Sequence, residues 1–216
     1  LPLSGIIEKS PNDMNSFDKY EKIKIAKAGH ISLKMNENID VDLTVTKRSG
    51  IGKFSFDNSN YGTLIIGTGI NSSPPENIKD AFVKITSESS CEGYTRGGDF
   101  CGTESDYKIY FAAEFDRPST YNGTWKEKKL STKKNSSGRN SGAYFTFDTD
   151  EIEKINYRIA ISFVSIENAK ENLRNEEKYL TFEEYQRETS KEWDSYLSTI
   201  KIKSKNEDRI KQFYTH

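Results

Sequence analysis

The sequence of 216 residues predicts a mostly β protein, an antiparallel β-sandwich that is followed by an α-helical linker. Two observations lead to this prediction. In residues 1–164 apolar and polar side chains alternate, as in half-buried strands, whereas from residue 165 the apolar side chains recur every three or four positions, as in amphipathic helices. Loops rather than crossover helices join the strand patterns, so the strands are expected to pair in antiparallel fashion.

The stretch IDVDLTVTKR at residues 39–48 carries the clearest strand pattern. Ile39, Val41, Leu43 and Val45 fall on one face, and their polar neighbours fall on the other. Turn-forming residues flank the stretch on both sides. The same criteria give eight expected strands, at residues 30–35, 39–48, 52–56, 63–69, 81–88, 107–115, 142–148 and 155–164.

Two long loops interrupt the strand patterns. NSSPPENIKD at residues 71–80 contains a Pro-Pro pair, which stops regular structure. KEKKLSTKKNSSGRNSG at residues 126–142 is basic, rich in Gly, Ser and Asn, and without apolar periodicity, so we predict a mobile surface loop. Its lysine cluster could meet an acidic partner, although a solvated loop is the simpler interpretation.

The pattern changes at Ser165, a suitable N-cap for a helix that runs to about residue 177. Thr181 and Glu184 then match a capping box, in which each side chain accepts a hydrogen bond from the other residue's backbone N–H. The next helix carries an apolar stripe, which we interpret as a packing surface, made of Phe182, Tyr185, Thr189, Trp193, Tyr196 and Ile200. If Trp193 is buried, its replacement by alanine should cost about 3–5 kcal/mol.

A last helix is expected in EDRIKQFYTH at residues 207–216, with Ile210, Phe213 and Tyr214 on its apolar side. A helix this short cannot bury that side by itself. We therefore expect the final residues to belong to a further domain that continues beyond the sequence.

The overall composition argues against some classes of protein. The 32 lysines and arginines are balanced by 33 aspartates and glutamates, so no basic field of the kind that attracts nucleic acid is expected. No apolar run approaches the roughly 18 residues of a membrane span, and no secretory signal pattern opens the sequence. Cys91 and Cys101 could form a disulfide across a loop or remain free thiols.

The search for a functional site gives one candidate, the loop GYTRGGDFCG at residues 93–102. Arg96, Asp99 and Phe100 could form a substrate-binding edge, because carbohydrate recognition uses aromatic faces and charged hydrogen-bonding groups. The alternative is a glycine-tolerant hairpin connection with Phe100 turned inward. The sequence contains no HExxH, paired CxxC or GxSxG motif, and nothing in it selects a catalytic pair of carboxylates.

Several stretches, in order along the chain, match the motifs of one known enzyme family. SFDKYEKIKIAKAGHISLKMNENIDVDLTVTKRSGIGKFSF is similar to F-x-H-x-x-E-x-A-x-P-G-Y-Y-x-V-x-L followed by E-L-T-x-T-x-R-x-G-x-x-x-Y-x-F. GYTRGGDFCG, YKIYFAAEFDRP and GAYFTFD are similar to G-Y-x-x-S/G-G, to Y-F with F-x-x-P, and to G-A-x-x-x-F. ISFVSIENAKENLRNE, EWDSYLSTIKI and FYTH are similar to S-F-V-S-x-x-x-A-x-x-N-L-x-x-E, W-x-x-x-L-x-x-I-x-V and F-Y-T-x-L-Y-H. With these matches nearly the whole chain resembles the N-terminal part of glycoside hydrolase family 92.

The resemblance implies a calcium-dependent, exo-acting α-mannosidase of the α-1,2 type that inverts the anomeric centre. Members pair an N-terminal sandwich of the supersandwich type with a helical linker and a C-terminal (α/α)6 barrel. By this resemblance, residues 1–164 form the sandwich, residues 165–205 the linker and residues 206–216 the start of the barrel. The general acid, the general base and the calcium ligands of the family lie in the barrel, so no catalytic or metal-binding residue carries over, and the isolated chain is expected to be inactive. His30 stands where the family has a tyrosine and is given no role.

The expected partners are mannose-containing glycans and the C-terminal catalytic domain of the same protein, with no nucleic acid. The expected location is extracellular or at the cell surface, with the cytoplasm as the alternative. Two other functions stay open. A carbohydrate-binding module or adhesin domain would bind sugar on its own, whereas a structural spacer would bind none.

Overall fold

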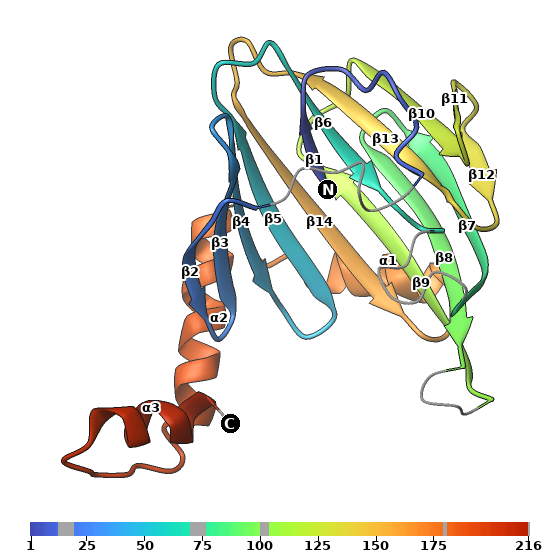
Figure 1. Ribbon diagram of the computed structural model, residues 1–216. Coiled ribbons are helices and arrows are strands. Elements are labelled where there is room, and N and C mark those ends of the chain that lie inside the picture. The colour runs from blue at the N-terminus through green and yellow to red at the C-terminus, as the bar shows by residue number, and fades with distance from the viewer. Residues whose placement is uncertain (13–19, 70–76, 100–103, 179–180, 216) are drawn as a thin grey trace.

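The computed structural model describes residues 1–12, 20–69, 77–99, 104–178 and 181–215 of the chain. In these residues, fourteen strands form two antiparallel sheets, and three helices follow the last strand. The two sheets lie against each other with most of the apolar core between them, and the helices lie behind the larger sheet (Figure 1). The predicted antiparallel β-sandwich with a helical C-terminal part is therefore confirmed.

The larger sheet has nine strands, and its last strand in sequence lies at its centre. Two meanders, β2 to β5 and β7 to β9, are each built from strands that are neighbours along the chain, and β14 pairs with β5 on one side and with β9 on the other. In spatial order the strands are β12 (Asn135–Ser137), β7 (Ile78–Ser87), β8 (Ser90–Gly98), β9 (Asp106–Phe115), β14 (Lys154–Ser162), β5 (Ser49–Phe56), β4 (Ile39–Val45), β3 (His30–Asn36) and β2 (Lys22–Lys27).

The smaller sheet covers one face of the larger one. In spatial order its strands are β1 (Pro2–Ser4), β6 (Tyr61–Ile66), β13 (Ser141–Asp148), β10 (Tyr121–Lys126) and β11 (Lys129–Ser131). Its central strand β13 points Ala143, Phe145 and Phe147, all fully buried, into the core. The ring centroid of Phe115, on β9 of the larger sheet, lies 4.6 Å from that of Phe145 and 5.2 Å from that of Phe147. These aromatic contacts hold the two sheets together.

Helices α1 (Ile166–Asn175) and α2 (Phe182–Leu197) begin at the predicted caps. The Ser165 side chain accepts a hydrogen bond from the Asn168 backbone N–H, and Thr181 and Glu184 form a complete capping box. Helix α1 buries its small apolar side against β9 and β14, and α2 lies across β3, β4 and β5. Helix α3 (Glu207–Thr215) has no buried residue. Both packed helices therefore occupy the outer face of the larger sheet, the face turned away from β13.

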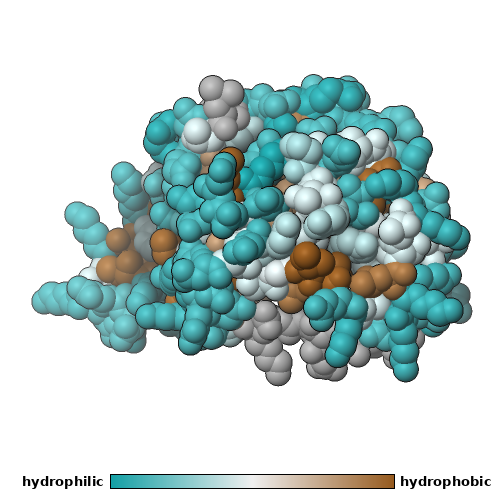
Figure 2. Space-filling model, turned by 90° about the horizontal axis from the view of Figure 1, so that it is seen from above, coloured by the Kyte–Doolittle hydropathy of each residue, from teal (hydrophilic) through white to brown (hydrophobic). Residues whose placement is uncertain are grey.

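The apolar stripe of α2 is buried along only half of its length. Phe182, Tyr185 and Thr189 are buried, and the surface that they pack against is the chain's own sheet. Trp193 and Tyr196 follow in the same helix and are exposed, at 42% and 65%; Ile200, 61% exposed, lies beyond the end of α2 at Leu197, so the predicted stripe is longer than the helix. No helix in the described part of the chain is long and apolar enough to cross a membrane. On the face seen from above, hydrophilic residues dominate and hydrophobic ones form small separate clusters (Figure 2).

All eight predicted strands are present, but three predicted loops are wrong in part. Residues 93–98, predicted as part of a glycine-rich loop, belong to β8, because its glycines lie where neighbouring backbone and side chains leave no room for a Cβ. Residues 126–142, predicted as a mobile loop, contain β11 and β12, which pair with β10 and β7. Residues 78–80, predicted as the end of the loop at 71–80, belong to β7, and residues 71–76 lie outside the described residues.

The sequence left open whether Cys91 and Cys101 form a disulfide, and the structure describes only Cys91. Cys91 is a free thiol in the core, where burial raises its pKa to about 12. Cys101 lies outside the described residues. The Cys91 thiol is therefore a packed apolar group and a poor nucleophile.

Candidate functional site

Arg96 lies near the end of β8 on the outer face of the larger sheet. Its Nε and Nη2 donate to the two carboxylate oxygens of Asp106, on β9, at 3.0 and 2.5 Å. This two-bond contact raises the pKa of Arg96 and lowers the pKa of Asp106. Both side chains are nearly half exposed. The guanidinium is thus held in a fixed position, with its remaining donors open to solvent.

Asp99 directly follows β8 and takes a left-handed backbone conformation, with φ of 59°. Its Oδ1 accepts a hydrogen bond from Lys79 Nζ at 3.1 Å, and the same Lys79 ammonium donates to the Ser105 carbonyl at 3.0 Å. The Asp99 side chain is about half exposed. Phe100, the third predicted substrate-binding residue, lies outside the described residues. The structure thus brings Arg96 and Asp99 to the same end of β8, each with an oppositely charged partner that the sequence did not reveal.

A row of aromatic side chains crosses the outer face beside Arg96. Phe82, Tyr94 and Tyr110 are cross-strand neighbours on β7, β8 and β9, with ring centroids 5.9 and 6.0 Å apart. The Tyr94 hydroxyl donates to Asp80 Oδ2 at 2.8 Å, and Lys108 Nζ lies 3.5 Å from the Tyr94 ring centroid. These three side chains were not predicted as site residues, although strand periodicity places cross-strand partners on one face of a sheet.

This group of side chains can bind polar molecules but is poorly suited to acid catalysis. Glycoside hydrolysis needs a carboxylic acid whose pKa is raised, so that it can donate its proton near neutral pH. The pKa of Asp106 is instead lowered by hydrogen bonding to Arg96. The chemistry that this face offers is hydrogen bonding from a guanidinium, an ammonium and carboxylates, next to aromatic rings.

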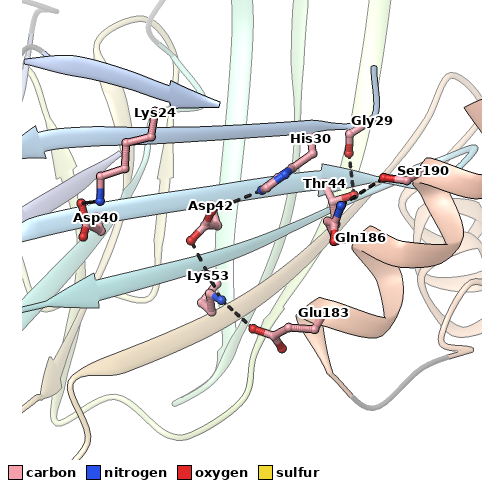
Figure 3. A network of polar contacts seen from close by, with 10 residues as sticks. All are labelled: Lys24, Gly29, His30, Asp40, Asp42, Thr44, Lys53, Glu183, Gln186 and Ser190. Carbon is pink, nitrogen blue, oxygen red and sulfur yellow. Dashed lines mark hydrogen bonds and ion pairs between the residues drawn. The ribbon is translucent and has the colours of Figure 1, made fainter. Parts of the chain in front are cut away.

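A second polar group joins helix α2 to the outer face of the sheet (Figure 3). His30 Nε2 lies 3.3 Å from Asp42 Oδ1, and Asp42 in turn lies 4.0 Å from the ammonium of Lys53. Lys53 Nζ bonds Glu183, in the first turn of α2, at 2.6 Å and lies 4.8 Å from the ring centroid of Phe182. His30 is largely buried, and its ring lies 6.1 Å from that of Phe182. No role was predicted for His30, which lies beneath the start of α2 in the structure.

Replacement of Glu183 by glutamine should destabilise the protein slightly at neutral pH and not at all in acid. Hydrogen bonding to Lys53 holds the pKa of Glu183 below its usual value. A carboxylate with a lowered folded-state pKa stabilises the folded protein above the unfolded pKa, and this contribution disappears as the pH falls through the lowered value. Thermal unfolding between about pH 7 and about pH 3 measures the effect. The matched control is Glu192→Gln, since Glu192 has no ion pair within the described residues; parallel curves for both variants would contradict the prediction.

The described part of the chain contains no group of side chains suited to the calcium ion that the family resemblance implies. Among the described residues, no three His, Cys, Asp or Glu side chains come together in a group that could hold a metal ion. The carboxylates near Arg96 are instead neutralised by Arg96 and Lys79. No step of a reaction is therefore assigned to calcium on these residues.

Two models of known protein families match this chain. The model of the glycosyl hydrolase family 92 N-terminal domain matches residues 1–162, and the model of the catalytic domain of the same family matches residues 168–216. The chain belongs to glycosyl hydrolase family 92. Helices α1, α2 and α3 of the family 92 chain lie almost entirely within the match to the catalytic domain. A comparison with curated proteins found no match.

Solved structures with the same fold include other family 92 proteins. An inverting mannosidase from Bacteroides thetaiotaomicron aligns with a TM-score of 0.80 and 21% identity, over 99% of this chain and 28% of that one. An alpha-mannosidase from the same bacterium aligns with a TM-score of 0.74 and 20% identity, over 94% of this chain and 29% of that one. A bacterial glucoamylase is more distant, with a TM-score of 0.55 and 12% identity, over 86% of this chain and 30% of that one. The family 92 chain thus spans less than a third of each of these proteins.

Proposed function

We propose that this chain is the N-terminal part of a glycosidase that removes terminal α-linked mannose from glycans, with α-1,2 linkage and with inversion. The observation that carries the proposal is the pair of family matches, to the N-terminal domain over residues 1–162 and to the catalytic domain over residues 168–216. Two structures of similar fold, from Bacteroides thetaiotaomicron, are described as mannosidases, one of them as inverting.

In this proposal, residues 1–164 form the sandwich, residues 165–205 a linker and residues 206–216 the start of the catalytic barrel, while the catalytic groups and calcium ligands belong to the remainder of the protein. Calcium, when bound there, would help to hold and distort the mannose ring. The described chain would supply a wall of the substrate pocket. This role is supported by position, since Arg96 and the row from Phe82 to Tyr110 lie on the same face of the sheet as α1.

The activity is tested on the chain together with its natural downstream sequence. We expect release of mannose from α-1,2-linked mannobiose, initially in the β form because inversion of an α-linkage gives that anomer, and loss of activity after calcium is removed by chelation. A folded, calcium-loaded protein that releases no mannose would contradict the proposal. Calorimetry of the chain alone separates the rival function, because a binding module or adhesin would bind mannosides without the downstream sequence.

Replacement of Arg96 or Asp99 by alanine should lower kcat/KM of the whole enzyme by roughly tenfold through a raised KM, because one charge-assisted hydrogen bond to substrate is about 1.5–3 kcal/mol. Substrate kinetics measure the effect. The control is Arg158→Ala, which removes a comparable outer-face cation that pairs with Glu114 and Glu177. If the Arg96 and Asp99 variants have the same kinetics as the unaltered enzyme, these residues do not bind substrate in the pocket.

Replacement of Trp193 by alanine should cost only about 1–2 kcal/mol in this chain, less than for a fully buried tryptophan, because 42% of the side chain is exposed. Tyr196 near the end of α2, Ile200 beyond it and Phe213 on α3 are exposed apolar residues, of the kind found on a surface that another part of the protein covers. The cost should therefore increase when the downstream sequence is present. Urea unfolding of both lengths measures this; equal costs would mean that Trp193 remains exposed.

A further inference from the structure

The basic segment at residues 126–140 is fixed in place because it joins the free edges of both sheets. Strand β11 ends the smaller sheet and β12 ends the larger one. Thr124 Oγ1 donates to the carbonyls of Lys133 and Asn135 at 3.1 and 3.3 Å, and Ser136 Oγ donates to the Trp125 carbonyl at 3.0 Å. Figure 1 shows β11 and β12 at the opposite end of the molecule from α2 and α3. The charges of this segment are thus held in a defined arrangement, far from α2 and α3.

The lysines of this segment form no ion pairs with the residues that the structure describes. Residues 126–134 contain five lysines and one acidic residue, Glu127. The lysines are Lys126, Lys128, Lys129, Lys133 and Lys134. Within the described residues none of these five lysines forms an ion pair, and Lys134 instead bonds the Asn122 side chain. Other lysines of the chain do form ion pairs with carboxylates, for example Lys53 with Glu183. The chain as a whole has a net charge of −1, so this is a local positive patch on a nearly neutral protein.

Two of these charges face each other at a cost to stability. Lys126 and Lys129 are direct partners in the pairing of β10 with β11. Like charges at directly opposite positions of a strand pair repel and destabilise the sheet. The turn between them also places Glu127 in the left-handed region, with φ of 50°. Lysines at sheet edges can serve simply to prevent strand association, but that role does not require a facing pair of lysines.

The patch surrounds a basin of about 830 Å³. Four of the lysines line it, together with neutral hydrogen-bonding groups from Asn135 and Ser136. Trp125 also contributes to the lining, and its indole Nε1–H is buried with no acceptor within the described residues. A buried N–H without a partner is unusual in a folded protein. Ammonium groups, hydroxyls and amides are together suited to a ligand that carries both oxyanions and neutral hydroxyls.

We propose that this basin binds the phosphate or sulfate groups of an anionic glycan. Several unneutralised ammonium groups around one basin favour a ligand with more than one negative charge, and the Asn and Ser side chains fit the hydroxyls of sugar rings. The choice of a glycan rests on the proposed function. The basin would hold a charged polysaccharide at a second site, whose lining does not include Arg96.

The test is a binding titration of the whole 216-residue chain, in which calorimetry measures the binding. The probes are phosphorylated mannan, the same mannan after enzymatic removal of phosphate, dextran sulfate, and single-stranded polyuridylate RNA. The basin variant combines Lys128→Gln, Lys129→Gln and Lys133→Gln. The control variant makes the same change of charge in another exposed segment, with Lys201→Gln, Lys203→Gln and Lys205→Gln. Since all six side chains are exposed, thermal unfolding should show that both variants fold.

We expect the unaltered chain to bind phosphorylated mannan, dextran sulfate or both, with the probe that binds identifying the oxyanion. The basin variant should bind roughly tenfold more weakly and the control variant nearly as well as the unaltered chain. Binding should weaken as salt rises from about 50 to about 300 mM. The proposal is overturned if neither anionic glycan binds, if dephosphorylated mannan binds equally well, if both variants lose the same affinity, or if RNA binds as tightly. Because the titration measures binding and not mannose release, its result is independent of the outcome of the activity assay.

Discussion

Replacement of Phe145 by alanine is expected to lower the free energy of unfolding by about 3–5 kcal/mol, the usual cost of deleting a buried aromatic side chain. Phe145 is completely buried at the centre of β13, and its ring meets that of Phe115 at 4.6 Å. The substitution removes one of the aromatic contacts that link the smaller sheet to the larger one, while that of Phe147 with Phe115 remains. Because typical proteins are stable by only about 5–15 kcal/mol, a large part of the total would be lost.

Urea unfolding, followed by circular dichroism, measures this loss. The matched control is Phe163→Ala, because Phe163 is the same residue type and is 69% exposed. The control should change the stability by no more than about 0.5 kcal/mol. Similar losses for both variants would show that the aromatic contacts between the sheets do not dominate the stability of the sandwich.

Replacement of Gly29 by alanine is expected to cost about 2–4 kcal/mol, from backbone strain of about 1–2 kcal/mol and from displacement of helix α2. Gly29 has φ of +77°, and a Cβ there would lie 2.5 Å from Thr189 Cγ2 and 2.7 Å from Trp193 Cδ1. To relieve these overlaps, the side chains of Thr189 and Trp193 must shift, with or without a movement of the helix away from the sheet. The hydrogen bond of 2.6 Å from Thr189 Oγ1 to the Val45 carbonyl would then be lost.

The control for Gly29 is Gly5→Ala, because Gly5 has a similar φ of +86° but no atom within 4 Å of its added Cβ. The control isolates the backbone strain, so the difference between the two variants measures the close approach of α2. Hydrogen exchange of the α2 amides should increase in the Gly29 variant and not in the Gly5 variant. Equal destabilisation by both substitutions would mean that α2 moves aside without cost.

The sequence predicted the strongly alternating strands and the helix starts, because these depend on local patterns. The capping box of Thr181 and Glu184 and the N-cap Ser165 needed no knowledge of the remainder of the fold. Strand β2 was not predicted, although Lys22 to Ile25 alternate between lysine and isoleucine, because this pattern is only four residues long and lies at a sheet edge where all six residues are exposed. Strand β8 was not predicted either, because its glycines are required by close neighbours across the sheet rather than by a turn.

The candidate site was less predictable than the fold, because its chemistry depends on partners that are distant in sequence. The loop pattern selected Arg96 and Asp99, but their partners Asp106 and Lys79 come from neighbouring strands. The stripe on α2 has the same limit. Its spacing shows which side of the helix is apolar, but only the length of the sheet decides that Thr189 is buried and Tyr196 is exposed. The fixed arrangement of the basic segment likewise depends on the sheet edges that it joins.

The central position of β14 has a consequence for synthesis on the ribosome. The two meanders of the larger sheet share no strand until residues 154–162 have been made, because only β14 pairs with both β5 and β9. A nascent chain that ends before Lys154 therefore holds two hairpin arrays with exposed inner edges, which invite association with other chains. Once β14 has been synthesised, it joins both arrays into a single sheet. Protection of the exposed edges by a chaperone is therefore most needed just before β14 is made.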